Sequence, residues 1–117
     1  MTVASFVFDL ELVGEVSVIR FVVDCIDSDN LDMVADELLE FITPDSPAKL
    51  VVDLSRVVSI DHVGLETLAI FHDSVVADGS DIRFCCLRPE FKTALQNSDR
   101  RPDIDFRDSL AEALVAF

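Results

Sequence analysis

The sequence predicts one small α/β domain over residues 1–117, with an N-terminal hairpin followed by alternating strands and helices. Two observations predict this class. Apolar residues recur at every second position near the N-terminus, and after residue 30 stretches of helical spacing alternate with short branched runs. A length of 117 residues supports one core but not two domains of ordinary size. We therefore expect a hairpin and then a βαβαβα order, with a mostly parallel sheet and helices packed on it.

The first two elements are expected to be the strands of the hairpin. Large apolar residues occupy every second position at Phe6, Phe8, Leu10 and Leu12. This period is typical of a half-buried strand. The turn is expected at Val13, Gly14 and Glu15, and it leads into a second apolar stretch at residues 16–23.

The first helix follows the hairpin. Its apolar positions have helical spacing and are Leu31, Val34, Ala35, Leu38, Leu39 and Ile42. Asp27, Ser28 or Asp29 is available as the N-cap before them. Pro44 and Pro47 are expected to end the helix, because proline cannot continue the helical hydrogen bonding.

A buried strand and a second helix come next. Residues 49–54 are short, branched and bounded by turn residues, which is typical of a central strand. A second helix fits residues 63–78, and Gly79 is placed to terminate it. The face expected to be buried contains Leu65, Leu68, Ala69, His72, Val75 and Val76.

The remaining elements complete the alternation. Residues 81–87 form the next expected strand, Pro89 suits the first turn of a third helix, and a short strand is expected around residues 104–106. Ser109 begins the final helix, and its spacing to Glu112 is that of a capping box. The apolar residues of these two helices are Phe91 and Leu95, and then Leu110, Ala113, Leu114 and Phe117.

The charge of the chain restricts its partners. Twenty-three acidic residues against nine basic ones give a formal net charge of −14, which repels phosphate backbones. We therefore expect no nucleic acid partner and no anionic membrane partner. Residues 21–48 contain eight acids and no lysine or arginine. This segment is either an acidic face toward a basic partner or a solvated surface that keeps the protein dispersed.

The chain is expected to be cytoplasmic. No apolar run is long enough for a membrane helix, and residues 1–6 lack the charged start of a signal peptide. Direct membrane insertion is therefore not expected. Cys25, Cys85 and Cys86 make an odd count without C-x-x-C spacing, which indicates buried free thiols in a reducing compartment. Adjacent cysteines in an extended strand would point to opposite faces.

The sequence contains no motif that requires catalysis or a cofactor. Three glycines provide no phosphate-binding loop, and a zinc site using His62 and His72 would need distant carboxylates, so no metal site is expected. His72 is expected to be a core or interface residue. An Asp61–His62 dyad lacks a nucleophile beside it. We therefore expect no enzymatic activity.

A phosphoacceptor domain is the main alternative fold. Asp53 ends an apolar strand as a phosphorylated aspartate would. Such a site needs an acidic pair after an early strand and a lysine at the end of a late strand. Lys49 and Lys92 are the only lysines, and they occupy a strand start and a helix. This alternative therefore fails on its chemistry.

Several motifs in order resemble the STAS domain family. Residues 50–55 and 60–65 are similar to the family's strand, loop and second helix. Residues 79–84 and 87–90 are similar to its turn into the next strand and the start of its third helix, and residues 108–114 to its closing helix. The first half of the chain conforms more loosely.

The resemblance implies a function in signalling and in the regulation of transcription. In anti-sigma-factor antagonists of this family, the loop and second helix bind a protein partner, which would be an anti-sigma factor, a switch kinase or a signalling scaffold. The implied partner-binding residues are Ser59, Asp61, His62, Val63, Gly64, Glu66 and Thr67. Asp61 alone is equally explained as an N-cap.

The family's regulatory serine is missing. The residue after the loop aspartate is a kinase-phosphorylated serine in the family, whereas this chain has His62 and then Val63. We therefore expect no phosphorylation at this position, and a binder that is constitutive or controlled by partner abundance. Imidazole titrates near neutral pH, so a pH-sensitive contact at His62 remains open. So do a homodimer and an accessory role beside a membrane transporter, since STAS-like domains also occur there.

Overall fold

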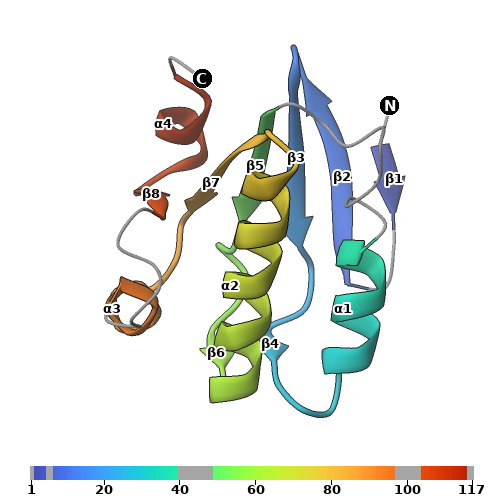
Figure 1. Ribbon diagram of the computed structural model, residues 1–117, viewed down its shortest axis with the longest axis vertical. Coiled ribbons are helices and arrows are strands. Elements are labelled where there is room, and N and C mark those ends of the chain that lie inside the picture. Colours follow the sequence, from blue (N-terminus) through green and yellow to red (C-terminus); the bar gives the residue numbers. More distant parts are fainter. Residues whose placement is uncertain (1, 5–6, 40–48, 97–103, 116–117) are drawn as a thin grey trace.

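A mixed sheet forms the centre of the molecule (Figure 1). The computed structural model describes residues 2–4, 7–39, 49–96 and 104–115, and within them one sheet has six strands in the order β1-β2-β3-β5-β7-β8. Their bounds are Thr2–Ala4, Phe8–Val13, Val16–Phe21, Lys49–Asp53, Asp81–Cys85 and Asp105–Arg107. Strands β1, β2 and β3 pair antiparallel, and β3, β5, β7 and β8 pair parallel. The predicted α/β class, with a mostly parallel sheet, is confirmed.

Three helices cover one face of this sheet. They are α1 (Leu31–Leu39), α2 (His62–Ala77) and α3 (Pro89–Gln96). Because the parallel strands follow one another in chain order, right-handed crossovers place all their helices on the same side. The fourth helix, α4 (Leu110–Leu114), packs through Ala113 against Val51 and Cys85 on the other face.

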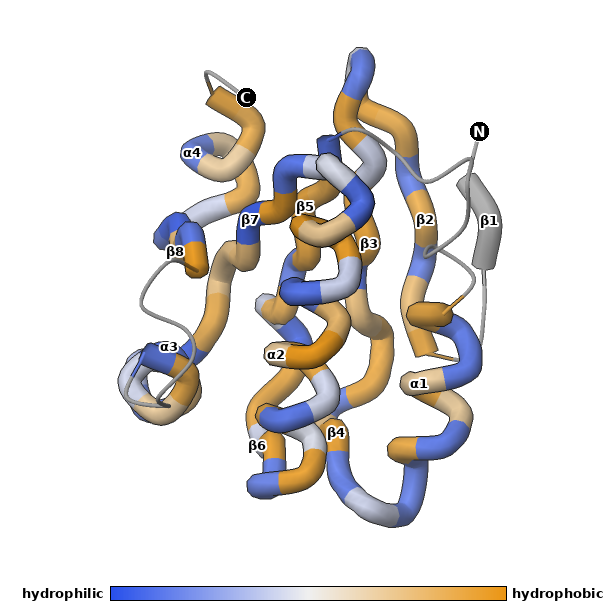
Figure 2. Tube along the Cα trace, viewed as in Figure 1, coloured by the Kyte–Doolittle hydropathy of each residue, from blue (hydrophilic) through white to orange (hydrophobic). Residues whose placement is uncertain are grey.

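The main core lies between the sheet and α1, α2 and α3. Its largest fully buried side chains include Phe21, Phe84, Ile19, Leu50 and Leu68. Figure 2 shows apolar residues concentrated along β3, β5 and β7, whereas polar and apolar residues alternate along α1 and α2. This contrast follows from burial, because central strands are covered on both faces and these helices on one.

The hairpin has the predicted turn. Val13 pairs with Val16, so Gly14 and Glu15 form a two-residue loop. Gly14 has a φ of 63°, which fits a turn with glycine at its first central position. The expectation for Leu12 was wrong: its side chain is exposed because it lies beside the turn, near the end of β2.

The apolar faces of α1 and α2 differ from prediction at their edges. Leu39 and Val76 are exposed, whereas Phe71 is buried although it was not assigned to the buried face. Each residue turns 100° around a helix, so Val76 leaves the face that Val75 occupies. His72 is buried, and its ring stacks on Phe84 with centroids 6.2 Å apart. The predictions for Phe6, Ile42, Pro44, Pro47 and Phe117 lie outside the described residues.

The helix ends follow the predicted chemistry in two cases. Gly79 ends α2 with a φ of 85°, and its N–H donates to the carbonyl of Val76. The hydroxyl of Ser109 accepts a bond from the N–H of Glu112, which confirms the cap of α4. The glutamate side chain closes the box on the N–H of Asp108, one residue before the cap.

The predicted N-cap of α1 was wrong. The residue directly before the helix is Asn30, and its carbonyl accepts the first helical bond from the N–H of Val34. The Asn30 amide also bonds the N–H of Asp27 and the carbonyl of Cys25. Asn30 thereby organises the turn before the helix.

Candidate functional site

The start of α2 is joined to the connection between β3 and α1 by a small second sheet. Strand β4 (Cys25–Ile26) pairs parallel with β6 (Ser59–Ile60), and neither strand was predicted separately. The N–H of Asp61 continues the pairing with a 3.1 Å bond to the carbonyl of Ile26. The first residue of α2 therefore follows directly from a hydrogen-bonded strand.

Asp61 binds backbone groups on two segments. One carboxylate oxygen, Oδ1, accepts the N–H of Gly64 at 2.8 Å, and Oδ2 accepts the N–H of Ser28 at 3.2 Å. The first bond satisfies a donor that the helix start leaves unpaired. The capping role considered for Asp61 is thus present, and the same carboxylate also ties α2 to the loop before α1.

Gly64 is required by close packing. A β-carbon at this position would lie 2.6 Å from the carbonyl oxygen of Ile26 and 2.9 Å from Cγ2 of Ile60. Glycine is the residue that permits such a close backbone approach. Gly64 is buried, so its role is to position α2 rather than to present a side chain.

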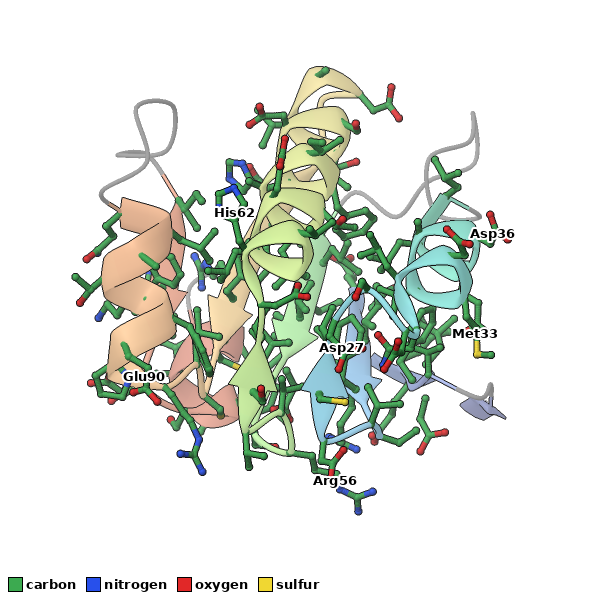
Figure 3. All side chains as sticks on the ribbon, turned by 90° about the horizontal axis from the view of Figure 1, so that it is seen from below. Asp27, Met33, Asp36, Arg56, His62 and Glu90 are labelled. Carbon is green, nitrogen blue, oxygen red and sulfur yellow. The ribbon has the colours of Figure 1, made fainter. Side chains whose placement is uncertain are left out.

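Five predicted site residues form what we call the α2 start surface. Ser59, His62, Val63 and Glu66 are exposed, and Thr67 is half-buried with its hydroxyl donating to the carbonyl of Val63. Figure 3 shows His62 at the beginning of α2, seen from the end at which this helix starts. Two further apolar residues, Val58 and Ile70, are exposed on the adjoining loop and helix. The seven-residue spacing of Val63 and Ile70 is the signal that could have identified the second of them.

The α2 start surface consists of exposed side chains beside a carboxylate that backbone groups already bind. Both oxygens of Asp61 are engaged by backbone N–H groups, and His62 is exposed. His72 is buried, where its ring stacks on Phe84 and its Nδ1 lies 3.3 Å from the carboxylate of Asp73. The two histidines therefore lie in different environments, His62 exposed to solvent and His72 buried in the core.

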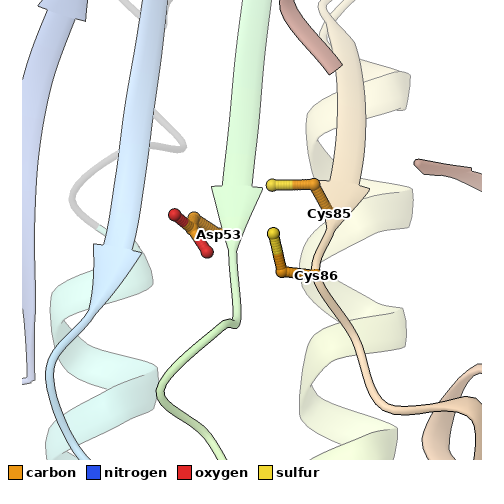
Figure 4. A group of neighbouring side chains, drawn as sticks. All are labelled: Asp53, Cys85 and Cys86. Carbon is orange, nitrogen blue, oxygen red and sulfur yellow. The ribbon is translucent and has the colours of Figure 1, made fainter. Parts of the chain in front are cut away.

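A second group of polar side chains lies at the carboxyl ends of β5 and β7. Among the described residues, Asp53, Cys85 and Cys86 bring their carboxylate and sulfur atoms within 4.8 Å of one another (Figure 4). The expectation that the two cysteines point to opposite faces was wrong. Cys86 lies after the end of β7 with a φ of 63°, so strand alternation does not govern its side chain. Burial raises the pKa of both thiols.

The comparisons with known proteins identify the family. The STAS domain model matches residues 8–113, which is most of the chain. This chain belongs to the STAS domain family. No curated protein matches the STAS domain described here. In the described residues, no helix combines the length and the apolar character that crossing a membrane requires.

Solved structures with the same fold include anti-sigma-factor antagonists. An antagonist from Mycobacterium paratuberculosis is 22% identical, with 99% of this chain and 92% of that one covered and a TM-score of 0.77. An anti-sigma-factor antagonist (STAS) domain protein from Planctomyces limnophilus is 20% identical, with coverages of 93% and 95% and a TM-score of 0.78. The murine Slc26a9 anion transporter matches 88% of this chain with 18% of its own, at 14% identity and a TM-score of 0.71.

Proposed function

We propose that this STAS domain is a protein-interaction module of bacterial-type signalling, related to anti-sigma-factor antagonists, and that it acts by binding rather than by catalysis. Its partner would be an anti-sigma factor, a switch kinase or a signalling scaffold in the cytoplasm. The α2 start surface would make the contact. The observation that carries the proposal is the exposure of His62, Val63 and Glu66 on a helix start that is held from beneath by Asp61 and Gly64.

The rigidity of this helix start supports a role in recognition. Asp61 bonds two separate segments, and Gly64 packs directly against the backbone of Ile26. Surfaces on a fixed scaffold lose little conformational entropy when a partner binds, which favours affinity. An exposed valine between two polar residues also provides an apolar centre with a polar surround, as partner-binding surfaces commonly do.

The chemistry at residue 62 supports a contact without a phosphoserine switch. Phosphorylation of a serine here would add almost two negative charges at a helix start. His62 has an imidazole in place of that hydroxyl and cannot accept phosphate as a serine would. The module would then be regulated through the amount of its partner or through another position.

A pair of matched valine substitutions tests the proposal. Val63 and Val76 lie on the same helix with exposed fractions of 41% and 46%, but at opposite ends. We expect Val63→Arg to weaken binding of the partner at least tenfold, because it places a charged side chain in the apolar centre of the contact. We expect Val76→Arg to bind as the unchanged protein does.

The measurement begins with capture of partners from the source cells on immobilised protein, followed by titration of the purified partner. Retained unfolding temperatures of both variants show that each remains folded. If Val63→Arg binds the partner with unchanged affinity, the α2 start surface is not the contact. Capture of an integral membrane transporter, rather than a kinase or anti-sigma factor, would favour the accessory role for which the transporter match gives a precedent in fold.

A further inference from the structure

The group formed by Asp53, Cys85 and Cys86 lies at the edge of the sheet where β5 and β7 end. Asp53 is the last residue of β5, and it pairs in register with Cys85 of β7. Figure 4 shows both sulfur atoms pointing toward β5. Their sulfur and carboxylate atoms lie within 4.8 Å of one another, although Cys85 follows Asp53 by 32 positions in the chain.

The backbone at Cys86 permits this arrangement. Its φ of 63° lies in the left-handed region, which costs roughly 1–3 kcal/mol for a residue other than glycine. Its N–H donates to the carbonyl of Arg107, which holds the turned backbone against β8. Two adjacent thiols are thereby directed to the same side of the sheet. In an extended strand they would point to opposite faces.

Two hydrogen bonds hold the carboxylate of Asp53 in place. Its Oδ2 accepts the Nε of Arg20 at 3.2 Å, and its Oδ1 accepts the N–H of Ser55 at 2.9 Å. Each carboxylate oxygen has two acceptor positions, so both retain one. Hydrogen-bond donors such as Arg20 and the Ser55 N–H orient the ligands of metal sites, and their bonds to the ligand are kept when the metal binds.

The surroundings combine burial with a route of access. Cys85 is fully buried and Asp53 is 4% exposed, whereas Cys86 is partly exposed. Leu110 and Leu114 of α4 pack against the apolar cluster that contains Cys85. The site is thus shielded on most sides and reachable at Cys86.

We propose that Asp53, Cys85 and Cys86 bind one thiophilic metal ion, with Zn²⁺ as the natural candidate. Two thiolates and a carboxylate are ligands that zinc accepts, and three protein ligands leave a fourth position for water or another donor. Tetrahedral geometry with zinc–sulfur bonds of about 2.3 Å separates two sulfurs by about 3.8 Å. The ligand atoms here lie within 4.8 Å of one another, so the two sulfurs are at most about 1 Å beyond that spacing. No metal is needed for the proposed contact at α2, so the two proposals stand independently.

Cadmium titration of the full chain tests this site, because cadmium bound to thiolates gives a charge-transfer absorbance in the ultraviolet. With the thiols kept reduced by a phosphine, we expect one equivalent of Cd²⁺ to bind. Zn²⁺ should displace it, and its affinity is then obtained by competition with a chromophoric chelator. We also expect Zn²⁺ to raise the unfolding temperature.

Three variants make the assignment specific. Cys86→Gly removes one ligand while glycine adopts the left-handed backbone freely, so the fold is retained. We expect it to weaken Zn²⁺ binding at least tenfold and to lose the zinc-induced rise in unfolding temperature. Asp53→Asn should also weaken binding, and its single amide oxygen can still accept the N–H of Ser55 while the contact with Arg20 is lost. Cys25→Ser is the matched control, because Cys25 is a partly buried free thiol on β4, outside the group.

The same titrations can overturn the proposal. It fails if the unchanged protein takes up no Cd²⁺ at micromolar concentration, or if Cys86→Gly binds within twofold of the unchanged protein. It also fails if Cys25→Ser weakens binding as much as Cys86→Gly does. Equal binding by the unchanged protein and Cys25→Ser, with loss in Cys86→Gly, supports it.

Discussion

Asp61 and Gly64 show how two residues fix the position of a whole helix. The carboxylate of Asp61 bonds the N–H groups of Gly64 and Ser28, and the missing side chain of Gly64 lets the carbonyl of Ile26 approach. Gly64 is buried and has no side chain, and both carboxylate oxygens of Asp61 are bonded to backbone N–H groups. Each instead sets the position of the exposed residues beside it.

Gly64→Ala is expected to destabilise the protein by about 1–3 kcal/mol, because the new methyl group overlaps backbone rather than a flexible side chain. Unfolding in urea measures the free energy. Glu66→Ala, a substitution of an exposed residue two positions further along the same helix, is the control and should change the free energy by less than about 0.5 kcal/mol. A Gly64→Ala variant as stable as the control would contradict the close approach at Ile26.

At the scale of single residues, the sequence predicted the cap at Asp61 but neither its second bond nor the close packing of Gly64. Asp61 was recognised because aspartate before an apolar helical pattern is a common N-cap. Its second bond joins residues 28 and 61, and helical spacing contains no information about such distant pairs. The turned backbone of Cys86 was missed for a related reason, since cysteine gives no signal for a positive φ.

At the scale of elements, the ends of β5 and β7 concentrate polar groups beside the core. Asp53 is held by Arg20, which also contacts Glu11 on β2 at 3.2 Å. The hydrogen bond from Arg20 to Asp53, together with the negative charge of Asp53, raises the pKa of the Arg20 guanidinium. Burial first, and the charge of Asp53 second, raise the pKa of the Cys85 thiol well above its usual range.

The raised pKa of Cys85 predicts a loss of stability in alkaline solution. The unfolded thiol ionises above about pH 8.5, whereas the folded thiol keeps its proton. The unfolded state then binds fewer protons, so the free energy of unfolding falls as pH rises, by up to about 1.4 kcal/mol per pH unit for this group. The stabilisation is fully present below about pH 8.5.

Cys85→Ala removes this titration. With a metal chelator present, we expect the difference in unfolding free energy between the unchanged protein and this variant to shrink by about 1–2 kcal/mol between pH 8 and pH 10. Ser80→Ala removes a buried hydroxyl that does not titrate in this range. The difference in unfolding free energy between the unchanged protein and Ser80→Ala should therefore stay constant from pH 8 to pH 10. A constant difference for Cys85→Ala as well would show that its thiol ionises equally in both states.

The sequence predicted the long elements well and the short ones poorly. Residues 49–54 and 63–78 have strong apolar patterns, and the structure places β5 and α2 there within a residue at each end. Strands β4 and β6 have two residues each, which is too short for any period to appear. Their pairing nevertheless sets where α2 begins, so the local geometry of the candidate site could not be obtained from periodicity.

At the scale of the whole molecule, the formal charge of −14 acts on a body only 32 × 29 × 25 Å in extent. At low ionic strength the screening length is about 30 Å, so each acidic group is repelled by most of the others. Composition alone revealed this property. The order of the strands, in contrast, depends on long-range pairing and was left open by the sequence.

Adding salt is therefore expected to stabilise the protein. Raising KCl from about 10 mM to about 150 mM at pH 7 shortens the screening length to about 8 Å and weakens the repulsion. The unfolding temperature, followed by circular dichroism, should rise by a few degrees. Asp36→Lys, a change at an exposed position of α1, should reduce this rise because it makes the net charge less negative. An unfolding temperature that falls with KCl would show that attractive ion pairs outweigh the repulsion.

Every strand of the six-stranded sheet after the first pairs with the strand that precedes it in that sheet. A chain emerging from the ribosome can therefore add each strand to an edge that already exists, starting from β1 and β2. No segment has to wait for a distant later one to fill a gap between its neighbours. We expect synthesis from the N-terminus to assemble the sheet outward in a single direction, ending with β8 and the helix that closes the far face.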